Sequence, residues 1–157
     1  MIRYLFVLVL SSFCYSQTSI ENAEAFIAKK EFVKAQNEMS TFLESNPNDL
    51  EAIELLGDAY GHQKKWDDAI AQYQKLKQKR PENANYQYKY GGALGMKALS
   101  ISKIKALGII GDVKDAFLKA AQLDPNHIEA RWALVELYVS LPGIVGGSFS
   151  KALAYAQ

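Results

Sequence analysis

The chain has 157 residues, of which 49% are hydrophobic and 22% charged, a composition that argues against an extended disordered protein. Its 18 basic and 17 acidic side chains give a formal net charge of +1. A protein that holds a phosphate backbone needs a basic excess, so nucleic acid is not an expected partner.

The N-terminus has the pattern of a secretory signal peptide. Arg3 precedes an apolar run over residues 4–10, and the small residue Ser16 precedes Gln17. The run is too short to span a bilayer comfortably. We therefore predict a signal peptide over residues 1–16, cleaved after Ser16, and an exported protein that is periplasmic or secreted. An uncleaved anchor or a lipid anchor on Cys14 are the alternatives.

Cys14 is the only cysteine of the chain. Cleavage after Ser16 would remove it and leave a mature protein without a thiol. Disulfides, thiolate metal sites and cysteine nucleophiles would then be excluded. We expect such a protein to be held together by packing alone.

The remaining sequence repeats itself. Prolines lie at Pro47, Pro81 and Pro125, at steps of 34 and 44 residues. Other positions keep the 34-residue step, namely Phe26–Tyr60–Leu94, Ala23–Gly57–Gly91, Phe32–Trp66, Ala35–Ala69 and Met39–Tyr73. The 44-residue step recurs at Tyr73–Phe117 and Leu76–Ala120. The chain therefore consists of repeats, one of which is ten residues longer than the others.

Within each repeat the apolar spacing is helical. Ile53, Leu56 and Tyr60 would share one face of a first helix, and Trp66 and Ile70 lie on the apolar face of a second. No segment alternates convincingly between apolar and polar residues, so we expect no sheet. The prolines are expected to end one helix and to start the next, because proline is tolerated in a first helical turn. Each repeat is predicted to be a helix–turn–helix unit.

The second repeat resembles the tetratricopeptide repeat (TPR) family. The residues that carry the resemblance are Ile53-x2-Leu56-Gly57-x2-Tyr60, then Ala69-x3-Tyr73, then Pro81. The family usually has tryptophan where Ile53 stands and alanine where Leu76 stands. The resemblance implies an all-α fold, a right-handed superhelical solenoid of antiparallel helix pairs with about 3.5 repeats.

The expected TPR-like domain covers residues 17–157, with repeats over about 17–49, 50–83, 84–127 and an incomplete 128–157. The third repeat has an insertion over about 99–112, for which we predict a lengthened helix or a packed loop. Its apolar residues are Ile101, Ile104, Leu107, Ile109 and Ile110. At the other end, Leu153 and Tyr155 would lack a following repeat. A fragment of a longer protein would explain this best, and a partner that covers the end is the alternative.

The stretch Leu141–Ala152, LPGIVGGSFSKA, raises the question of a phosphate-binding loop. Its glycines and lysine do not have the required spacing, and a predicted helix precedes them instead of a strand. In the repeat register the stretch is an interhelical turn, five residues longer than its counterpart. Gly143 would cap the preceding helix, and Ser148 or Ser150 would cap the next. The stretch resembles turns of some exported bacterial repeat proteins.

The two histidines, His62 and His127, give little support to catalysis or metal binding. Glu54, Asp58 and His62 line one predicted helix face and could hold a divalent cation weakly, but a solvated face is the commoner explanation. His127 follows the proline of a turn and is expected to be solvated. We predict no catalytic residues, no metal ligands and no cofactor.

The TPR resemblance implies that the first helix of each pair lines a concave groove that receives a protein or peptide. The candidate groove residues are Glu54, Asp58, His62, Tyr88, Met96, Trp132 and Glu136. Acidic and aromatic side chains suit a basic or amphipathic peptide. An equally weighted alternative is that Tyr88 and Trp132 only pack against the inserted segment.

The predicted function is a non-catalytic binding scaffold of the cell envelope or secreted space. The alternative is a component that binds a solute or a metal for an envelope or transport system. An enzyme that uses the glycine-containing stretch is a distant third hypothesis.

Overall fold

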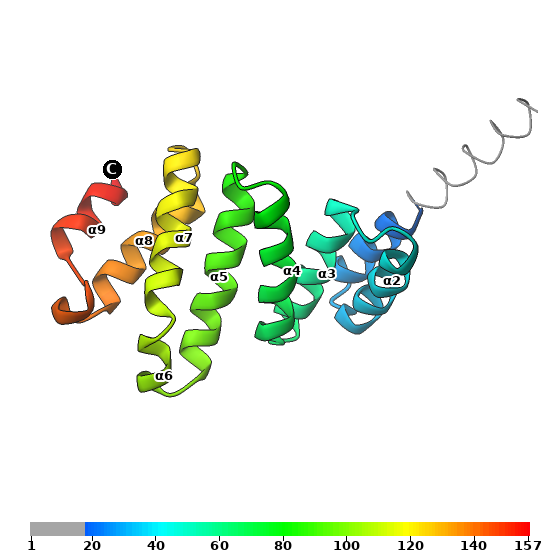
Figure 1. Ribbon diagram of the computed structural model, residues 1–157, viewed down its shortest axis with the longest axis horizontal. Coiled ribbons are helices and arrows are strands. Elements are labelled where there is room, and N and C mark those ends of the chain that lie inside the picture. The colour runs from blue at the N-terminus through cyan, green and yellow to red at the C-terminus, as the bar shows by residue number, and fades with distance from the viewer. Residues whose placement is uncertain (1–17) are drawn as a thin grey trace, which may run out of the picture. The chain divides into compact units, whose positions relative to one another are not determined.

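A computed structural model describes residues 18–157, and every regular element in that range is a helix (Figure 1). The all-α repeat fold expected from the spacing is thereby confirmed. The predicted signal peptide lies outside the described residues. Within residues 18–157, no helix combines the length and the apolar character needed to cross a bilayer. The chain forms two compact units that divide between Gln72 and Tyr73, inside α4 (Trp66–Lys79).

The first unit contains a helix over residues 18–28, α2 (Phe32–Ser45), α3 (Leu50–His62) and the first half of α4. The buried residues of α2 are Ala35, Met39 and Phe42, whose spacing puts them on one face. This face packs against α3. The hydrophobic core cluster consists of Ile20, Ala23, Met39, Phe42, Ala52 and Leu56.

Two turns of the first unit repeat the same backbone conformation at lysine residues. Lys30 and Lys64 both have φ of 60°, in the left-handed region that favours glycine. At the first turn, the N–H of Glu31 donates to the carbonyl of Phe26 at 2.8 Å. At the second, the N–H of Lys65 donates to the carbonyl of Tyr60 at 3.0 Å. Each helix therefore ends in a Schellman-type turn, although glycine is the usual residue at this position.

The second unit begins in α4 and continues through five further α-helices and one 3-10 helix. Their bounds are α5 (Ala84–Ser100), α6 (Lys103–Leu107), α7 (Ile110–Leu123), α8 (Ile128–Ser140), η1 (Gly143–Val145) and α9 (Phe149–Ala156). In this unit α5 packs against α7, α7 against α8, and α8 against α9. The long helices α5, α7 and α8 and the terminal α9 therefore pack side by side in chain order, as a helical repeat requires.

The contact between α5 and α7 depends on a glycine. A Cβ atom placed on Gly91 would lie 3.0 Å from the Cβ of Ala116 and 3.0 Å from the ring of Phe117. Both partners are buried, and so are Val113 and Ala120 on the same helix. The small residue at this repeat position thus lets the two helices approach closely.

Three helices begin with a capping side chain at the interval of the repeats. Asp49 Oδ1 accepts from the N–H of Ala52 at 3.0 Å, and Asn83 Oδ1 accepts from the N–H of Tyr86 at 3.0 Å. The third cap is His127. Each capping residue lies two positions after a repeat proline, so these prolines belong to the turns and not to the first helical turns as expected.

The insertion of the third repeat extends α5 and adds the short helix α6. Helix α5 has 17 residues, whereas α3 and α8 have 13 each. The lengthened helix agrees with the sequence prediction. The prediction that the inserted apolar residues pack is confirmed only in part. Ile104 and Leu107 are exposed. The partly buried ones are Ile101, Ile109 and Ile110.

Candidate functional site

Three of the sequence-predicted groove residues lie in the first unit, on α3. Glu54 and Asp58 are partly buried, and both take part in polar or electrostatic interactions. The ring of His62 stacks on the ring of Phe32, with centroids 4.4 Å apart and an interplanar angle of 8°. Within residues 18–157, no group of three or more His, Cys, Asp or Glu residues is arranged to hold a metal ion.

The other candidate residues lie in the second unit. Tyr88 on α5 is partly buried, and its ring contacts Phe117 and His127, with centroids 5.9 Å and 5.0 Å away. Burial raises the pKa of the Tyr88 hydroxyl, and the carboxylates of Glu129 and Glu136 raise it further, against the opposing effect of Lys89. Both carboxylates are therefore near enough to Tyr88 to act electrostatically on its hydroxyl.

Trp132 stands between these carboxylates on α8. Glu129, Trp132 and Glu136 are spaced by three and four residues, so they share one face of the helix. The tryptophan side chain is 60% exposed, which is unusual for so large an apolar group. We call Tyr88, Glu129, Trp132 and Glu136 the α5–α8 surface. It combines two rings with two carboxylates.

Met96 lies two turns beyond Tyr88 on α5 and is exposed. Glu136 has an electrostatic effect on Tyr88, and Glu136 and Trp132 share one face of helix α8. Glu129 was missed by the sequence reasoning. Its spacing from Trp132 and Glu136 on a predicted helix was the signal that could have identified it. The ring contacts of Tyr88 are with Phe117 and His127, outside the 99–112 segment.

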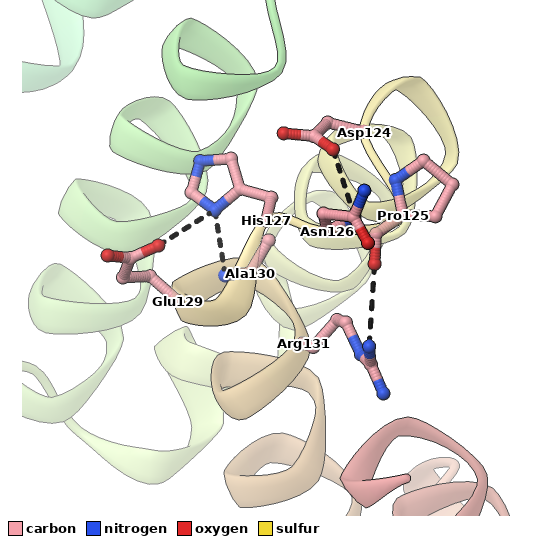
Figure 2. A network of polar contacts seen from close by, with 7 residues as sticks. All are labelled: Asp124, Pro125, Asn126, His127, Glu129, Ala130 and Arg131. Atoms are coloured by element: carbon pink, nitrogen blue, oxygen red, sulfur yellow. Dashed lines mark hydrogen bonds and ion pairs between the residues drawn. The ribbon is translucent and has the colours of Figure 1, made fainter.

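His127 joins the α5–α8 surface to the start of α8 (Figure 2). Its Nδ1 accepts from the N–H of Ala130 at 3.3 Å and lies 3.2 Å from Oε2 of Glu129. The expectation of a solvated side chain is wrong, because the His127 side chain is only 10% exposed. Nδ1 can accept from Ala130 only without a proton, and can donate to Glu129 only with one. The two contacts therefore belong to different protonation states or tautomers of the ring.

The glycine-containing stretch connects α8 to α9 and is a turn, as the repeat register predicts. The N–H of Ser148 donates to the carbonyl of Tyr138 at 2.9 Å, and Ser148 Oγ caps α9 by accepting from the N–H of Lys151 at 3.4 Å. The predicted cap at Gly143 is wrong, because α8 ends at Ser140 and Gly143 begins η1. Glycine is required instead at Gly146, which has φ of 98°.

The end of the second unit is better covered than the sequence suggested. The ring of Tyr155 stacks on that of Tyr138, with centroids 6.1 Å apart, and Arg131 Nε donates to the carbonyl of Tyr155 at 3.1 Å. Leu153, in contrast, is exposed, as is Phe149. Helix α9 thus covers α8 and leaves an apolar face of its own uncovered.

A shallow polar cleft of about 450 Å³ also lies in the second unit. Its charged lining residues are Lys77, Asp112, Asp115 and Lys119. The ammonium group of Lys77 lies over the ring of Tyr90, 4.1 Å from its centroid. Burial raises the pKa of the Tyr90 hydroxyl, and the carboxylate of Asp112 adds to the effect. Two positive and two negative groups give the cleft no preference for an anion or a cation.

Comparison with solved structures supports the TPR-like fold. MamA from Desulfovibrio magneticus RS-1 superposes with a TM-score of 0.74 at 17% identity, over 90% of this chain and 71% of that one. A thermophilic TPR protein from Thermus thermophilus gives a TM-score of 0.72 at 16% identity, over 89% and 74% of the two chains. MamA of strain AMB-1 gives 0.66 at 20% identity, over 90% and 69%.

No protein-family model matches the sequence, and no curated protein matches it significantly. The likeness to the solved structures therefore concerns the fold. The chain has the TPR-like architecture that the family resemblance implied.

Proposed function

We propose that this protein is a non-catalytic scaffold that binds a basic or amphipathic peptide segment of a partner protein through the α5–α8 surface. The carrying observation is Trp132, a 60% exposed ring that stands between Glu129 and Glu136 on one helix face. An exposed tryptophan offers a large apolar area that loses little conformational freedom on binding. The flanking carboxylates would orient a cationic partner and attract it from a distance.

The chemistry of the surface supports a basic partner over an acidic one. A lysine or arginine of the peptide can place its charged group over the Trp132 ring and form an ion pair with Glu129 or Glu136. Tyr88 adds a second ring and keeps its proton, because burial and both carboxylates raise the pKa of its hydroxyl. The TPR-like fold adds support, because first helices of its repeats carry the candidate residues.

The proposed location is the cell envelope or the secreted space. It is supported by the arrangement of Arg3, the apolar run over residues 4–10 and Ser16. Mass spectrometry of the protein purified from its own cells tests this part separately. A mature chain that begins at Gln17 is expected, and a mature chain that retains residues 1–16 would contradict cleavage at this position.

Fluorescence anisotropy with labelled peptides tests the binding site. The probe is an amphipathic peptide of alternating lysine and leucine pairs, and the matched peptide has glutamate in place of lysine. We expect the lysine peptide to bind more tightly. Trp132→Ala should weaken its binding by about 30-fold, the effect of removing a central aromatic anchor. Glu136→Lys should also weaken binding of the lysine peptide, and the loss should be larger at low salt than at high salt.

Phe149→Ala is the matched control, because Phe149 is an exposed ring of the same unit outside the α5–α8 surface. It should leave binding unchanged. Equal affinity of the two peptides, or an unchanged affinity in both Trp132→Ala and Glu136→Lys, would refute the proposed site. Circular dichroism of each variant separates loss of binding from loss of folding.

A further inference from the structure

The inserted segment of the second unit ends in an apolar tip that packing does not explain. Leu99, at the end of α5, is 82% exposed, and Ile104 and Leu107 on α6 are 85% and 53% exposed. Single exposed aliphatic side chains are common, but three within nine residues form a patch that needs an explanation. We call residues 99–107 the insertion tip.

The charged side chains within the tip, Lys103 and Lys105, have one sign. Between Glu82 and Asp112 the chain has lysines at positions 89, 97, 103 and 105 and no acidic side chain. Lys103 and Lys105 are exposed and stand on either side of Ile104 in the sequence. The chain as a whole is close to neutral, so the tip is a local concentration of positive charge. A complementary partner must therefore be both apolar and anionic.

The position of the tip suits a flat partner. Helix α6 packs against α5 and α7. It lies at the lower end of this helix pair in Figure 1, opposite the end at which α7 leads into α8. The high exposure of Leu99 and Ile104 shows that these side chains project from the tip, whereas a peptide that binds in a groove needs a concave surface. A bilayer interface can accept a projecting apolar tip, because headgroups move aside to admit it.

We propose that the insertion tip docks the protein on the surface of a membrane that contains anionic phospholipids. Ile104, Leu107 and Leu99 enter the boundary between headgroups and acyl chains. Lys103 and Lys105 extend their aliphatic stems along this boundary and place their ammonium groups at the lipid phosphates. The contact is peripheral and reversible, because a few side chains enter the bilayer and no helix of the tip crosses it.

Vesicle co-sedimentation of the full chain tests this proposal. The probe vesicles contain equal parts of phosphatidylglycerol and phosphatidylcholine, and pure phosphatidylcholine vesicles are the comparison. We expect binding to the anionic vesicles that decreases as salt is added. Lys103→Gln with Lys105→Gln should weaken binding by about 25-fold, about fivefold for each lysine. Ile104→Ser with Leu107→Ser should also weaken binding, and the binding that remains should depend more strongly on the salt concentration.

The matched control is Lys29→Gln with Lys30→Gln, which removes two exposed lysines of the first unit and should not change binding. All variants retain residues 1–17, so any contribution of that segment is common to them. Hydrogen exchange provides a local readout. Amides of residues 99–107 should gain protection when anionic vesicles are added, and should gain none with phosphatidylcholine alone.

Two results would overturn the proposal. The first is vesicle binding that is the same in the wild type and in both tip variants, with no added protection over residues 99–107. The second is protection of these residues that appears on raising the protein concentration without lipid, because the tip would then be covered by a second copy of the chain. Both tip pairs are exposed, so the variants are expected to fold.

Discussion

The close approach of α5 to α7 predicts that Gly91→Ala destabilises the protein, although alanine is the better helix former. An added methyl group would lie 3.0 Å from the Cβ of Ala116 and 3.0 Å from the ring of Phe117. Normal contact between carbon atoms is about 3.5–4.0 Å, so the helices must separate or the ring must move. Cβ of Ala116 is attached directly to the backbone and cannot rotate away.

The magnitude follows from two opposing effects. Replacing glycine by alanine inside a helix stabilises it by about 1 kcal/mol. Overpacking a close contact costs about 1–3 kcal/mol. Because atoms of two different side chains are too close, we expect the upper half of this cost and a net destabilisation of about 1–2 kcal/mol.

Gly92→Ala is the matched control, since a Cβ on Gly92 would meet nothing within 4 Å. It should stabilise the protein by about 0.5–1 kcal/mol through helix propensity alone. Urea unfolding followed by far-UV circular dichroism measures both variants. The double variant Gly91→Ala with Ala116→Gly should be less destabilised than the sum of the two single variants, because the contact with Ala116 is removed. The reasoning is refuted if Gly91→Ala is as stable as Gly92→Ala.

Substitutions at four other positions test local features of the structure. Lys64→Gly should stabilise the protein by about 0.5–1 kcal/mol in thermal unfolding, because Lys64 has φ of 60°, and Lys64→Ala should give no gain. His127→Ala should cost about 1 kcal/mol in urea unfolding through loss of the α8 cap, and His127→Asn should cost less. Gly147→Ala should destabilise by more than about 2 kcal/mol, because a Cβ there would overlap the carbonyl of Leu141. In ultraviolet titration, Tyr88→Phe should remove a hydroxyl that ionises at higher pH than that of an exposed tyrosine.

The sign of the tyrosine effect on stability follows from the raised pKa. The folded state holds the Tyr88 proton more tightly than the unfolded state, whose pKa is close to the ordinary tyrosine value of 10.0. Its contribution is therefore complete below pH 10.0 and is lost as the pH rises through the folded pKa. Tyr88→Phe should lose less stability than the wild type in this range, and an equal loss in both would contradict the assignment. Glu136→Gln should lower the pKa of Tyr88 only part of the way to the ordinary tyrosine value, because burial is the larger cause of the raised pKa.

Repetition made the fold readable from the sequence. The 34-residue interval between equivalent apolar positions, such as Phe26 and Tyr60, identified helix pairs, and the structure has helices at these positions. A hydrophobic face recurs in every repeat because each unit must bury it against its neighbour. Local signals were weaker wherever a side chain could play two roles. His127 was assigned to solvent because it follows the proline of a turn, yet it occupies the capping position that Asp49 and Asn83 hold in other repeats.

The insertion and the candidate site were less predictable for different physical reasons. Helix α6 has five residues, too few for a periodic pattern or for stability without tertiary contacts. Apolar residues such as Ile104 were read as packed, whereas hydrophobicity alone does not say which side chains find a neighbour. Electrostatic interactions between helices, such as that of Tyr88 with Glu129, depend on tertiary placement and leave no spacing signal in the sequence.

The two lysines with left-handed backbone conformation, Lys30 and Lys64, make the stability of their turns depend on ionic strength. A lysine next to a helix C-terminus places a positive charge beside the partial negative charge of the helix dipole, which glycine cannot do. At Lys30 and Lys64 the left-handed backbone conformation is unfavourable for a residue with a Cβ, and the attraction between the lysine charge and the helix dipole opposes this cost. Salt screens the attraction and leaves the backbone cost unchanged. At these two turns the stability advantage of glycine over lysine should therefore grow as salt increases.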